Sequence, residues 1–350
     1  MKKPLRLFYL PNEGVEGDQV GPRLAFEHAA AKGQLGAYQV YSYLVRDKAI
    51  GDHARAKQEL LDVARAFGPD VIFVQHMNAS YPVDDAFIQL LKAIPSNPKL
   101  VLWEGDPYGR VFKKIDASLQ AVMRSSNIVF LTGMGYVAEA ARRYGASKVR
   151  FCHNSFDDVR FGTPWEPTRK RPLDVVMISN LFNIKRMPGL YLPGGRQRKQ
   201  LASAFHTAFG DRFDLYGAGK GWQGKPYLRG PIPFADQLPK ARSAWMSISW
   251  DQFPELPMNS SDRPIISLAN GIPFLTNYQR GYELAYGDIP GFYWFHSPSE
   301  AVDIAQFLLA MPVDRRIEMG VAAAEHMKKH FHADKIYGDV LRVIEEELSS

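Results

Sequence analysis

Short apolar runs alternate with segments of helical periodicity along the whole chain of 350 residues. This alternation is typical of parallel sheets whose strands are connected by helices. In the first half we expect strands at 5–10, 37–44, 70–75, 99–104, 127–132 and 148–153. Helical patterns lie between them at 20–33, 53–68, 83–94, 115–125 and 135–145.

The alternation stops at residues 161–172 and then starts again. This segment, FGTPWEPTRKRP, combines three prolines with a cluster of cationic residues and has no periodicity, which is typical of a linker. Beyond it we expect strands at 173–180, 213–217, 245–250, 272–277 and 291–295. Helices are expected at about 198–209, 235–243, 260–270, 299–310, 314–330 and 334–348.

The length exceeds what one hydrophobic core usually serves, so the pattern predicts two domains. We expect an α/β protein with two Rossmann-like, doubly wound domains that face each other across a cleft. The N-terminal domain would span 1–165, and the C-terminal domain would span 172–333. A last helix within 334–350 would pack back towards the first domain. Ligands of such sheets bind at the carboxyl ends of the strands.

Composition narrows the class of partner. The net charge is +6, which favours nucleotides, nucleic acid or acidic glycans, although scattered lysines on a mildly basic enzyme would give the same balance. Cys152 is the single cysteine, which excludes a disulfide within the chain and a cysteine-based metal site. No apolar run approaches the length of a membrane span or a signal peptide, so we expect a cytoplasmic protein.

Two helix starts in the second half carry cations. In PMNSSDRPIISLANGIPFLTN (257–277), polar residues that favour helix caps precede Arg263; they are Asn259, Ser260, Ser261 and Asp262. A guanidinium beside the first amides of a helix suits a phosphate, although a solvated arginine next to an ordinary cap has the same pattern. In PGGRQRKQL (193–201), a glycine pair precedes Arg196, Arg198 and Lys199. Two cationic helix starts in one domain suggest a diphosphate.

Candidates for acid–base chemistry lie in the first half. The strand at 99–104 ends with Glu104, and Asp106 follows it by two residues. Asp18 lies in a glycine-bearing loop after the first strand. Asp106 sits after an apolar strand, where partial desolvation would raise the pKa of a base, although Asp-Pro also commonly starts a turn. His76 at a strand end has either a functional or a structural role.

The second half resembles the GT-B glycosyltransferases, in particular those akin to the spore-maturation protein CgeB. That group has an R-x-x-E-x-x-x-x-G pattern before an apolar strand, and FDLYGAGKGWQGKPYLRGPIPFADQLPKARSAWMSISW (213–250) resembles its strand, glycine turn, loop and helix. LVLWEGDP (100–107) is similar to the family's apolar strand that ends in an acidic residue and proline. The layout is also similar to the phage DNA β-glucosyltransferase, whose base, phosphate-contacting arginine and helix-start arginine match Asp106, Arg198 and Arg263.

The resemblance implies a hexosyltransferase-type enzyme that transfers a sugar from a nucleotide-diphosphate sugar, most often a UDP-sugar, to a hydroxyl. It implies inversion with Asp106 as base, with Asp18 and Glu104 as the other candidates, although retaining families share the fold. The donor and its phosphates would be bound by Arg198, Arg263, Arg196, Asn259, Ser260, Ser261 and Gly217. We expect no tightly bound cofactor, and the absence of an Asp-x-Asp triplet argues against an obligatory divalent metal.

The acceptor divides the hypotheses. The resemblance implies that the C-terminal domain binds the nucleotide sugar and the N-terminal domain binds the acceptor. The acceptor would be a bacterial glycan or a hydroxymethylated base in phage DNA, and His76, Tyr108 and Arg110 would contact it. One residue departs from the pattern, because Ile266 stands where the family glutamate would hold the ribose hydroxyls. The alternatives are therefore a non-catalytic nucleotide-binding protein of the same fold or a sugar-nucleotide epimerase.

Overall fold

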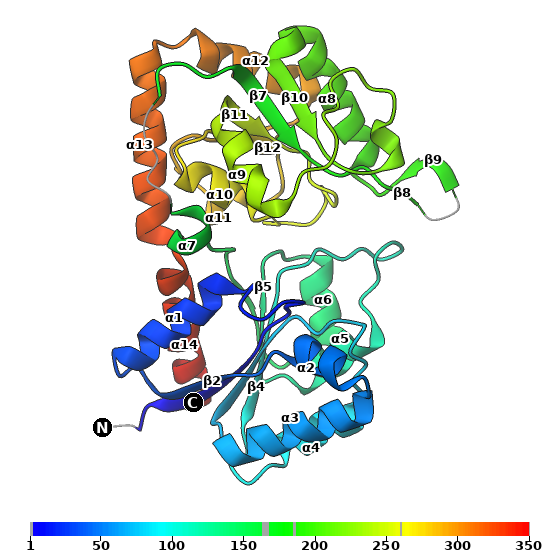
Figure 1. The fold of residues 1–350 in the computed structure, drawn as a ribbon, viewed down its shortest axis with the longest axis vertical. Helices are drawn as coiled ribbons and strands as arrows, with labels where there is room; N and C mark the ends of the chain where they lie inside the picture. Colours follow the sequence, from blue (N-terminus) through cyan, green and yellow to red (C-terminus); the bar gives the residue numbers. More distant parts are fainter. Residues whose placement is uncertain (1–2, 163–167, 185–186, 260, 350) are drawn as a thin grey trace. The chain divides into compact units, whose positions relative to one another are not determined.

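The computed structural model describes residues 3–162, 168–184, 187–259 and 261–349. The chain divides into two compact units, Met1–Ser155 with His332–Ser350 (unit 1) and Phe156–Phe331 (unit 2). Figure 1 shows the elements of both units. The segment 161–172, expected as a linker, includes residues 163–167, which lie outside the described residues.

Unit 1 is built on a six-stranded parallel sheet with the order β2-β1-β3-β4-β5-β6. Its elements are β1 (Leu5–Leu10), α1 (Val20–Ala31), β2 (Leu35–Val40), α2 (Tyr43–Ile50), α3 (His53–Phe67), β3 (Val71–Gln75), α4 (Asp85–Lys92), β4 (Lys99–Glu104), α5 (Ala117–Ser125), β5 (Ile128–Leu131), α6 (Tyr136–Arg143), β6 (Val149–Phe151) and α14 (Ala333–Ser349). Every residue of β3 is buried, because helices cover both faces of the sheet.

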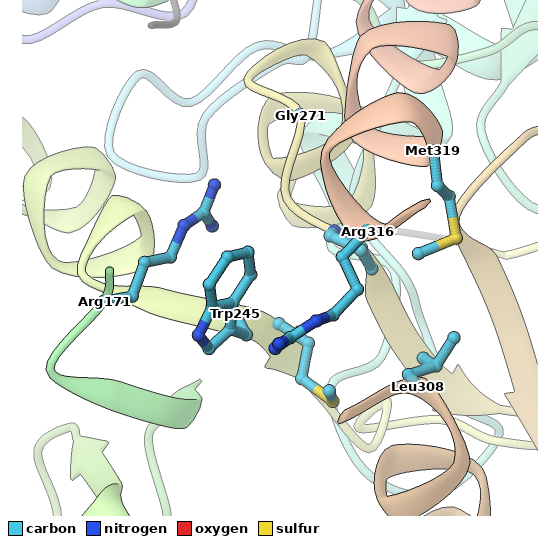
Figure 2. Close-up of a pocket in the computed structure, with 8 residues that line it drawn as sticks. Arg171, Trp245, Gly271, Leu308, Arg316 and Met319 are labelled. Carbon is cyan, nitrogen blue, oxygen red and sulfur yellow. The ribbon is translucent and has the colours of Figure 1, made fainter. Parts of the chain in front are cut away.

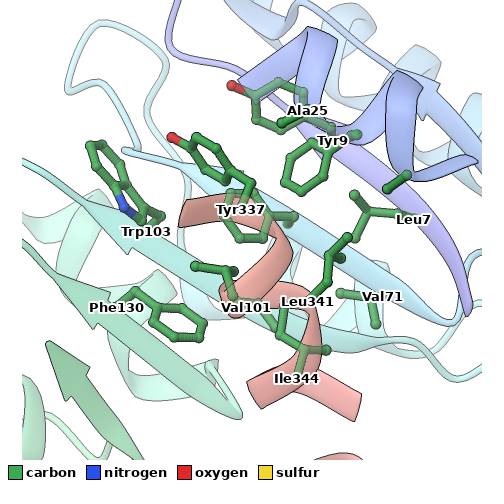
Figure 3. Close-up of a cluster of buried hydrophobic side chains, with 14 of the residues drawn as sticks. Leu7, Tyr9, Ala25, Val71, Val101, Trp103, Phe130, Tyr337, Leu341 and Ile344 are labelled. Atoms are coloured by element: carbon green, nitrogen blue, oxygen red, sulfur yellow. The ribbon is translucent and has the colours of Figure 1, made fainter. Parts of the chain in front are cut away.

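The last helix of the chain contributes to the core of unit 1. α14 packs beside α1 on one face of the sheet, and Figure 3 shows Tyr337, Leu341 and Ile344 lying over strand residues. Phe8 points to the other face, where its ring contacts Phe67 of α3 at 5.9 Å between centroids. The apolar periodicity of residues 334–348 thus corresponds to a core helix.

Unit 2 repeats this architecture with a five-stranded parallel sheet of order β10-β7-β11-β12-β13. Its elements are α7 (Asp158–Phe161), β7 (Leu173–Ile178), β8 (Asn183–Ile184), β9 (Met187–Tyr191), α8 (Gly195–Phe209), η1 (Gly210–Arg212), β10 (Phe213–Tyr216), η2 (Lys220–Trp222), α9 (Phe234–Arg242), β11 (Ala244–Ile248), α10 (Arg263–Ala269), β12 (Phe274–Asn277), α11 (Tyr282–Ala285), β13 (Phe292–Phe295), α12 (Pro298–Ala310) and α13 (Val313–His330). Helices α8 and α12 share one buried cluster with the sheet. The two parallel, helix-covered sheets confirm the predicted fold class.

Three local predictions were wrong. The strand expected at 37–44 ends at Val40, and the buried Tyr41 and Tyr43 lead into α2, so aromatic residues suggested a longer strand than the chain forms. The helix expected at about 260–270 begins only at Arg263, and the side chain of the cap residue Asp262 makes no capping hydrogen bond. Helix α8 begins at Gly195, three residues before the expected start near Arg198, and Gly194 is its N-cap residue.

None of the helices within the described residues combines the length and the hydropathy that crossing a bilayer requires.

Candidate functional site

The carboxyl edge of the unit 2 sheet contains the point where the strand order reverses. The chain runs from β7 to its neighbour β10 and then returns to the other side of β7 as β11. Doubly wound sheets bind ligands at such a switch point. Helix α8 starts here, since the amide of Gly194 donates to the Gln252 carbonyl beyond β11 at 2.8 Å. A Cβ on Gly194 would lie 2.0 Å from the Asp251 carbonyl oxygen, so only glycine allows this approach.

Arg198, in the first turn of α8, bridges the ends of β7 and β11. Its Nε donates to the carbonyl of Trp250 at 2.6 Å and its Nη1 to the carbonyl of Asn180 at 2.9 Å. The side chain is only 9% exposed. Within the part of the chain that the structure describes, no carboxylate lies within ion-pair distance of it. Burial and the nearby charge of Arg263 lower the pKa of Arg198 to about 10, so the guanidinium remains charged at neutral pH.

Asp251 follows β11 and is the anionic neighbour of this cation. Its carboxylate accepts hydrogen bonds from the amide of Gln279 and from the hydroxyl of Tyr282, the latter at 3.1 Å. Burial raises the pKa of Asp251, and the charges of Arg198 and Arg263 partly offset this shift. The charges of these two arginines and of Asp251 are therefore close enough to act on one another.

Arg263 is the first residue of α10. Its Nη1 lies 3.5 Å from the Ser261 hydroxyl, at the limit of a hydrogen bond, and its Nε is buried without a partner among the described residues. Asn259 is buried, and its carbonyl accepts the Tyr282 hydroxyl at 2.8 Å. Ser260 lies outside the described residues. The sequence predicted a run of capping side chains here. The structure instead has a short helix that starts at Arg263, whose guanidinium has a buried N–H without a partner among the described residues.

Other polar atoms at this edge also lack partners. The hydroxyls of Ser179 and Ser249 and the indole Nε1 of Trp250 are buried and make no hydrogen bond within the described ranges. Ser179 directly follows β7, and Ser249 and then Trp250 follow β11. Buried polar groups are normally satisfied, so an unpaired set next to a buried cation indicates a place where a polar ligand would complete the pairing.

The remaining donor residues expected from the sequence are distributed around this edge. Gly217 follows β10, where a Cβ would lie 2.0 Å from the Ser179 carbonyl oxygen, so the glycine permits a close approach of two strand ends. Arg196 is exposed on the outer side of α8. Ile266 lies within α10 and is partly buried. The structure therefore brings Arg198 and Arg263 together and leaves Arg196 at the surface.

The carboxyl edge of the unit 1 sheet carries a different group. His76 follows β3, and its Nδ1 lies 2.7 Å from Oε2 of Glu104, the last residue of β4. The other oxygen of Glu104 accepts the backbone N–H of Asp106 at 2.8 Å. Burial raises the pKa of Glu104. The pKa of His76 is also raised, because the hydrogen bond and charge of Glu104, with Asp106 and Asp116, outweigh the opposing effect of burial.

Asp106 itself is not desolvated, which corrects the expectation from the sequence. Its side chain is 52% exposed and forms an ion pair with Lys113 at 2.8 Å. The strand buries Glu104 instead, because the chain leaves the sheet at Gly105. Asp18 is exposed in the loop after β1, so it does not join the buried group.

The residues expected to contact an acceptor differ in how accessible their side chains are. Tyr108 is buried, and burial with nearby carboxylates raises the pKa of its hydroxyl. Arg110 is exposed and forms an ion pair with Glu139 at 3.4 Å. No helix begins in 106–114, since α5 starts at Ala117. Of the three, only His76 combines a strand-end position with a partly accessible side chain.

Sequence reasoning missed several polar residues of both edges. Glu13, after β1, is buried and pairs with Arg23 and with the Ser42 hydroxyl. Gln75 accepts the Tyr9 hydroxyl and donates to Gln19 at 2.8 Å. Asp251 was also missed. Both Gln75 and Asp251 stand at the ends of predicted strands, so the strand-end rule would have found them.

The unit 1 group also has the composition of a metal site. Ligand atoms of His76, Glu104 and Asp106 lie within 4.8 Å of one another. His76 is paired with Glu104, and Asp106 is paired with Lys113, so each group has a partner within the protein. We assign no metal to these residues.

A small pocket lies at the opposite, amino edge of the unit 2 sheet. Figure 2 shows Trp245 between Arg171 and Arg316, whose guanidinium carbons lie 4.8 and 4.0 Å from its ring centroid. Arg171 also donates to the Ala244 carbonyl at 2.6 Å. Both cations are thus stacked on one indole, an arrangement that stabilises the sheet edge. Arg198 lies at the carboxyl ends of the strands, so this pocket at their amino ends is separate from it.

Comparisons with known proteins agree with this architecture. Residues 196–342 match a family model described as "Glycosyl transferase-like". A search of curated proteins found no match. HepE of Anabaena, solved with UDP and glucose, is 11% identical with a TM-score of 0.59, and the match covers 98% of this chain and 100% of that one. Sucrose-phosphate synthase of Thermosynechococcus elongatus is 12% identical with a TM-score of 0.60, and the coverage is 98% and 99%.

A third solved structure has a different described activity. The putative UDP-N-acetylglucosamine 2-epimerase of Listeria monocytogenes is 11% identical with a TM-score of 0.52, and the match covers 99% of this chain and 97% of that one. Likeness at such identities shows the fold, and the narrower resemblance to CgeB-like proteins and to the phage enzyme stays a prediction. The chain has the two-domain GT-B fold, and its residues 196–342 match a glycosyl transferase-like family.

Proposed function

We propose that the protein is a glycosyltransferase that uses a nucleoside diphosphate sugar, with UDP as the nucleotide, and a hydroxyl acceptor. The observation that carries this proposal is Arg198, a buried guanidinium at the switch point of unit 2 that is held by backbone carbonyls and has no carboxylate partner among the described residues. Buried charges are normally paired, so an anion would complete this site.

A diphosphate suits the site better than a single carboxylate. Arg198 and Arg263 supply two forked donors, and the buried carboxylate of Asp251 opposes their charge. The unpaired hydroxyls of Ser179 and Ser249 add further donors next to the same strand ends. The described complexes of HepE with UDP support UDP as the nucleotide to test first.

The proposed chemistry requires two contributions from the protein. In the transfer, the bond between the sugar C1 and the phosphate oxygen breaks, and its electron pair stays on UDP. The acceptor oxygen forms a new bond to C1, and its proton passes to a base. The arginines would stabilise the charge that develops on the diphosphate, which is often the larger effect. The base would come from the carboxyl edge of unit 1, where the sequence proposes Asp106 and inversion at C1.

The acceptor is proposed to be a glycan hydroxyl of a bacterial surface polymer, and a modified DNA base is the competing choice. DNA binding would need free cations on the surface near 106–114. Arg110 pairs with Glu139 and Lys113 pairs with Asp106, which reduces the positive charge of that segment. This pairing favours the uncharged acceptor.

An epimerase is the second candidate, because one of the similar folds carries that description. Both activities would use the same diphosphate site, and the reaction products separate them. A transferase releases UDP and a sugar, whereas an epimerase returns a nucleotide sugar with an inverted centre. A non-catalytic binding protein would leave the donor unchanged.

The test is a thermal-shift and calorimetric screen of nucleoside diphosphates and their sugars. UDP and UDP-glucose should raise the melting temperature, since a ligand that binds only the folded state stabilises it. Arg198→Met and Arg263→Met should each weaken UDP binding by about thirtyfold or more. Arg212→Met is the matched control, because that arginine pairs with Asp174 at the amino edge of the same sheet and should leave the affinity unchanged.

Two results would contradict the proposal. One is the absence of binding by any nucleoside diphosphate. The other is an equal loss of affinity in Arg212→Met, which would trace the effect to general destabilisation of unit 2.

A further inference from the structure

We infer that His76, held in place by Glu104, is the catalytic base that takes the proton of the acceptor hydroxyl, in place of the Asp106 that the sequence favours. The inference rests on the proposed function and assigns roles within the group at the carboxyl edge of unit 1.

The backbone of His76 is fixed in an uncommon conformation. Its φ is 54°, in the left-handed region that costs energy for a residue other than glycine. Its N–H donates to the Trp103 carbonyl at 2.8 Å, and its carbonyl accepts the Tyr43 hydroxyl at 3.1 Å. The hydroxyl of Tyr43 also accepts the N–H of Asn78 at 3.0 Å. The chain thus keeps a strained geometry that aims the imidazole at Glu104.

The side chain of His76 is oriented by a carboxylate that cannot move. Glu104 is 1% exposed, one oxygen accepts the Asp106 N–H, and the other faces Nδ1 of His76. This pairing holds the proton of neutral imidazole on Nδ1 and leaves the lone pair on Nε2. Nε2 makes no hydrogen bond to any residue that the structure describes, and the side chain is 17% exposed. A substrate hydroxyl can therefore reach it.

Asp106 is less suited to the role. Its carboxylate is exposed to water and its Oδ2 is engaged by Lys113 at 2.8 Å. A solvated carboxylate is a weak base, whereas imidazole titrates near neutral pH, where base catalysis is most efficient. Asp106 instead contributes its backbone N–H to Glu104 and its charge to the neighbourhood of His76.

The charges around His76 decide whether its pKa is raised or lowered. Glu104 from β4, Asp106 from the following loop and Asp116 before α5 all raise the pKa of His76, and burial opposes them. The hydroxyls of Tyr43 and Tyr108 are neutral neighbours, since burial raises their pKa values above the usual range. A base must be neutral to accept a proton, so the rate should rise with pH through a pKa above that of free imidazole.

The proposed step balances in atoms and charge. The acceptor oxygen attacks C1 while its proton moves to Nε2 of His76, and UDP leaves with the electron pair of the broken bond. The resulting imidazolium keeps its Nδ1–H bond to Glu104. With water as the acceptor, the products are free glucose and UDP, so the step can be measured before the natural acceptor is identified.

The test uses UDP release from UDP-glucose in the full-length protein, with water as the acceptor. His76→Asn is the informative variant, because asparagine tolerates a positive φ but cannot accept the proton. We expect the rate to fall by about 100-fold or more, with the Kd of UDP unchanged. His53→Asn is the matched control and should stay within about threefold of the wild type, since it makes the same substitution at a histidine of unit 1 that is 54% exposed and pairs with Asp47.

Glu104 is a positioning residue, and Glu104→Gln tests it through the pH profile. Without the negative charge, the pKa of His76 falls, so the rising limb of the rate should move to lower pH while the maximal rate drops. A loss of activity without a shift of the limb would indicate a structural role alone and contradict the assignment. An unchanged rate in His76→Asn, or a large loss confined to Asp106→Asn, would overturn it.

The proposed function and this inference fail differently. If UDP-glucose does not bind, the proposed function is wrong and the reaction assigned to His76 falls with it. If UDP-glucose binds but the wild type releases no UDP, the tautomer of His76 decides, measured in ¹⁵N-histidine NMR spectra. A neutral ring with its proton on Nδ1 supports the inference, and a proton on Nε2 overturns it.

Discussion

The carboxyl edges of the two sheets have the same topology and opposite chemistry. In both sheets the first strand lies between the second and the third, so both have a switch point next to the first strand. In unit 1 a cation at this edge, Arg23, pairs with the buried Glu13. In unit 2 the cation at this edge, Arg198, donates to two backbone carbonyls and faces a second arginine.

The difference shows how one architecture is given two tasks. The neutralised edge of unit 1 keeps one titratable ring, His76, whose charge state its surroundings can adjust. The edge of unit 2 keeps excess positive charge, which destabilises the free protein and favours an anionic ligand. The fold places both sites, and the pairing of charges decides what each of them can bind.

Removing Arg23 would unbalance the charges at the carboxyl edge of unit 1. Arg23→Met leaves the carboxylate of Glu13 buried with only Ser42 and the Gln19 N–H as donors. We expect the free energy of unfolding to fall by about 3 kcal/mol, since one partner of a buried pair is lost. Urea denaturation of the variant measures this change.

Its control is Arg46→Met, which removes an ion pair of the same unit with both partners partly exposed. That change should cost less than about 1 kcal/mol. Equal losses of unfolding free energy in the two variants would show that the buried Arg23–Glu13 pair stabilises unit 1 no more than an exposed pair does. The pKa of Glu13 is lowered in the folded state, so the stability from this pair should be present at neutral pH and lost as the pH falls through that lowered pKa.

Much of the fold was predictable because its strands are continuous apolar runs. The bounds expected for β1 and β4 agree with the structure, since parallel strands covered on both faces contain little but apolar residues. The short hairpin of β8 and β9 and the one-turn helices α7 and α11 were not predicted. Elements of two to five residues are too short for a period to be recognised.

The site was predictable where one segment carries the signal. Arg198 was found because a glycine pair and a cation stand together at a helix start after the first strand of the unit. The contact between His76 and Glu104 joins residues 28 positions apart. It depends on the register of β3 and β4, in which Gln75 pairs with Trp103 and the next residues become neighbours. Sequence pattern alone does not provide that register.

Removing the charge of Asp251 would make the unit 2 edge still more positive. Burial raises the pKa of Asp251 in the folded state, so ionising it at neutral pH costs stability. Asp251→Asn keeps an oxygen for Gln279 and Tyr282 and should raise the free energy of unfolding by about 1 kcal/mol at pH 7. It should also tighten UDP binding by about threefold, since the edge becomes more positive.

The sign of the effect can be checked with pH. Between the unfolded pKa of about 4 and the raised folded pKa, the folded wild type binds more protons than the unfolded chain, so its stability falls as the pH rises. Asp251→Asn lacks the titrating carboxyl group and therefore this contribution to the pH dependence of stability. The gap between the two proteins should therefore close on acidification below about pH 4, as measured by thermal unfolding at several pH values. A gap that is independent of pH would mean that packing, rather than charge, causes it.

Removal of metal ions tests whether arginines suffice as the cations of unit 2. A chelator such as EDTA should change UDP release from UDP-glucose by less than about twofold, because Arg198 and Arg263 supply the positive charge that a divalent ion would otherwise bring to the diphosphate. The measurement compares rates before and after chelation at constant ionic strength. If activity is lost and returns with Mn²⁺ or Mg²⁺, the two arginines do not suffice. The same experiment in Asp106→Asn then shows whether the unit 1 group holds the ion, because removing one of its carboxylates would weaken the response to metal.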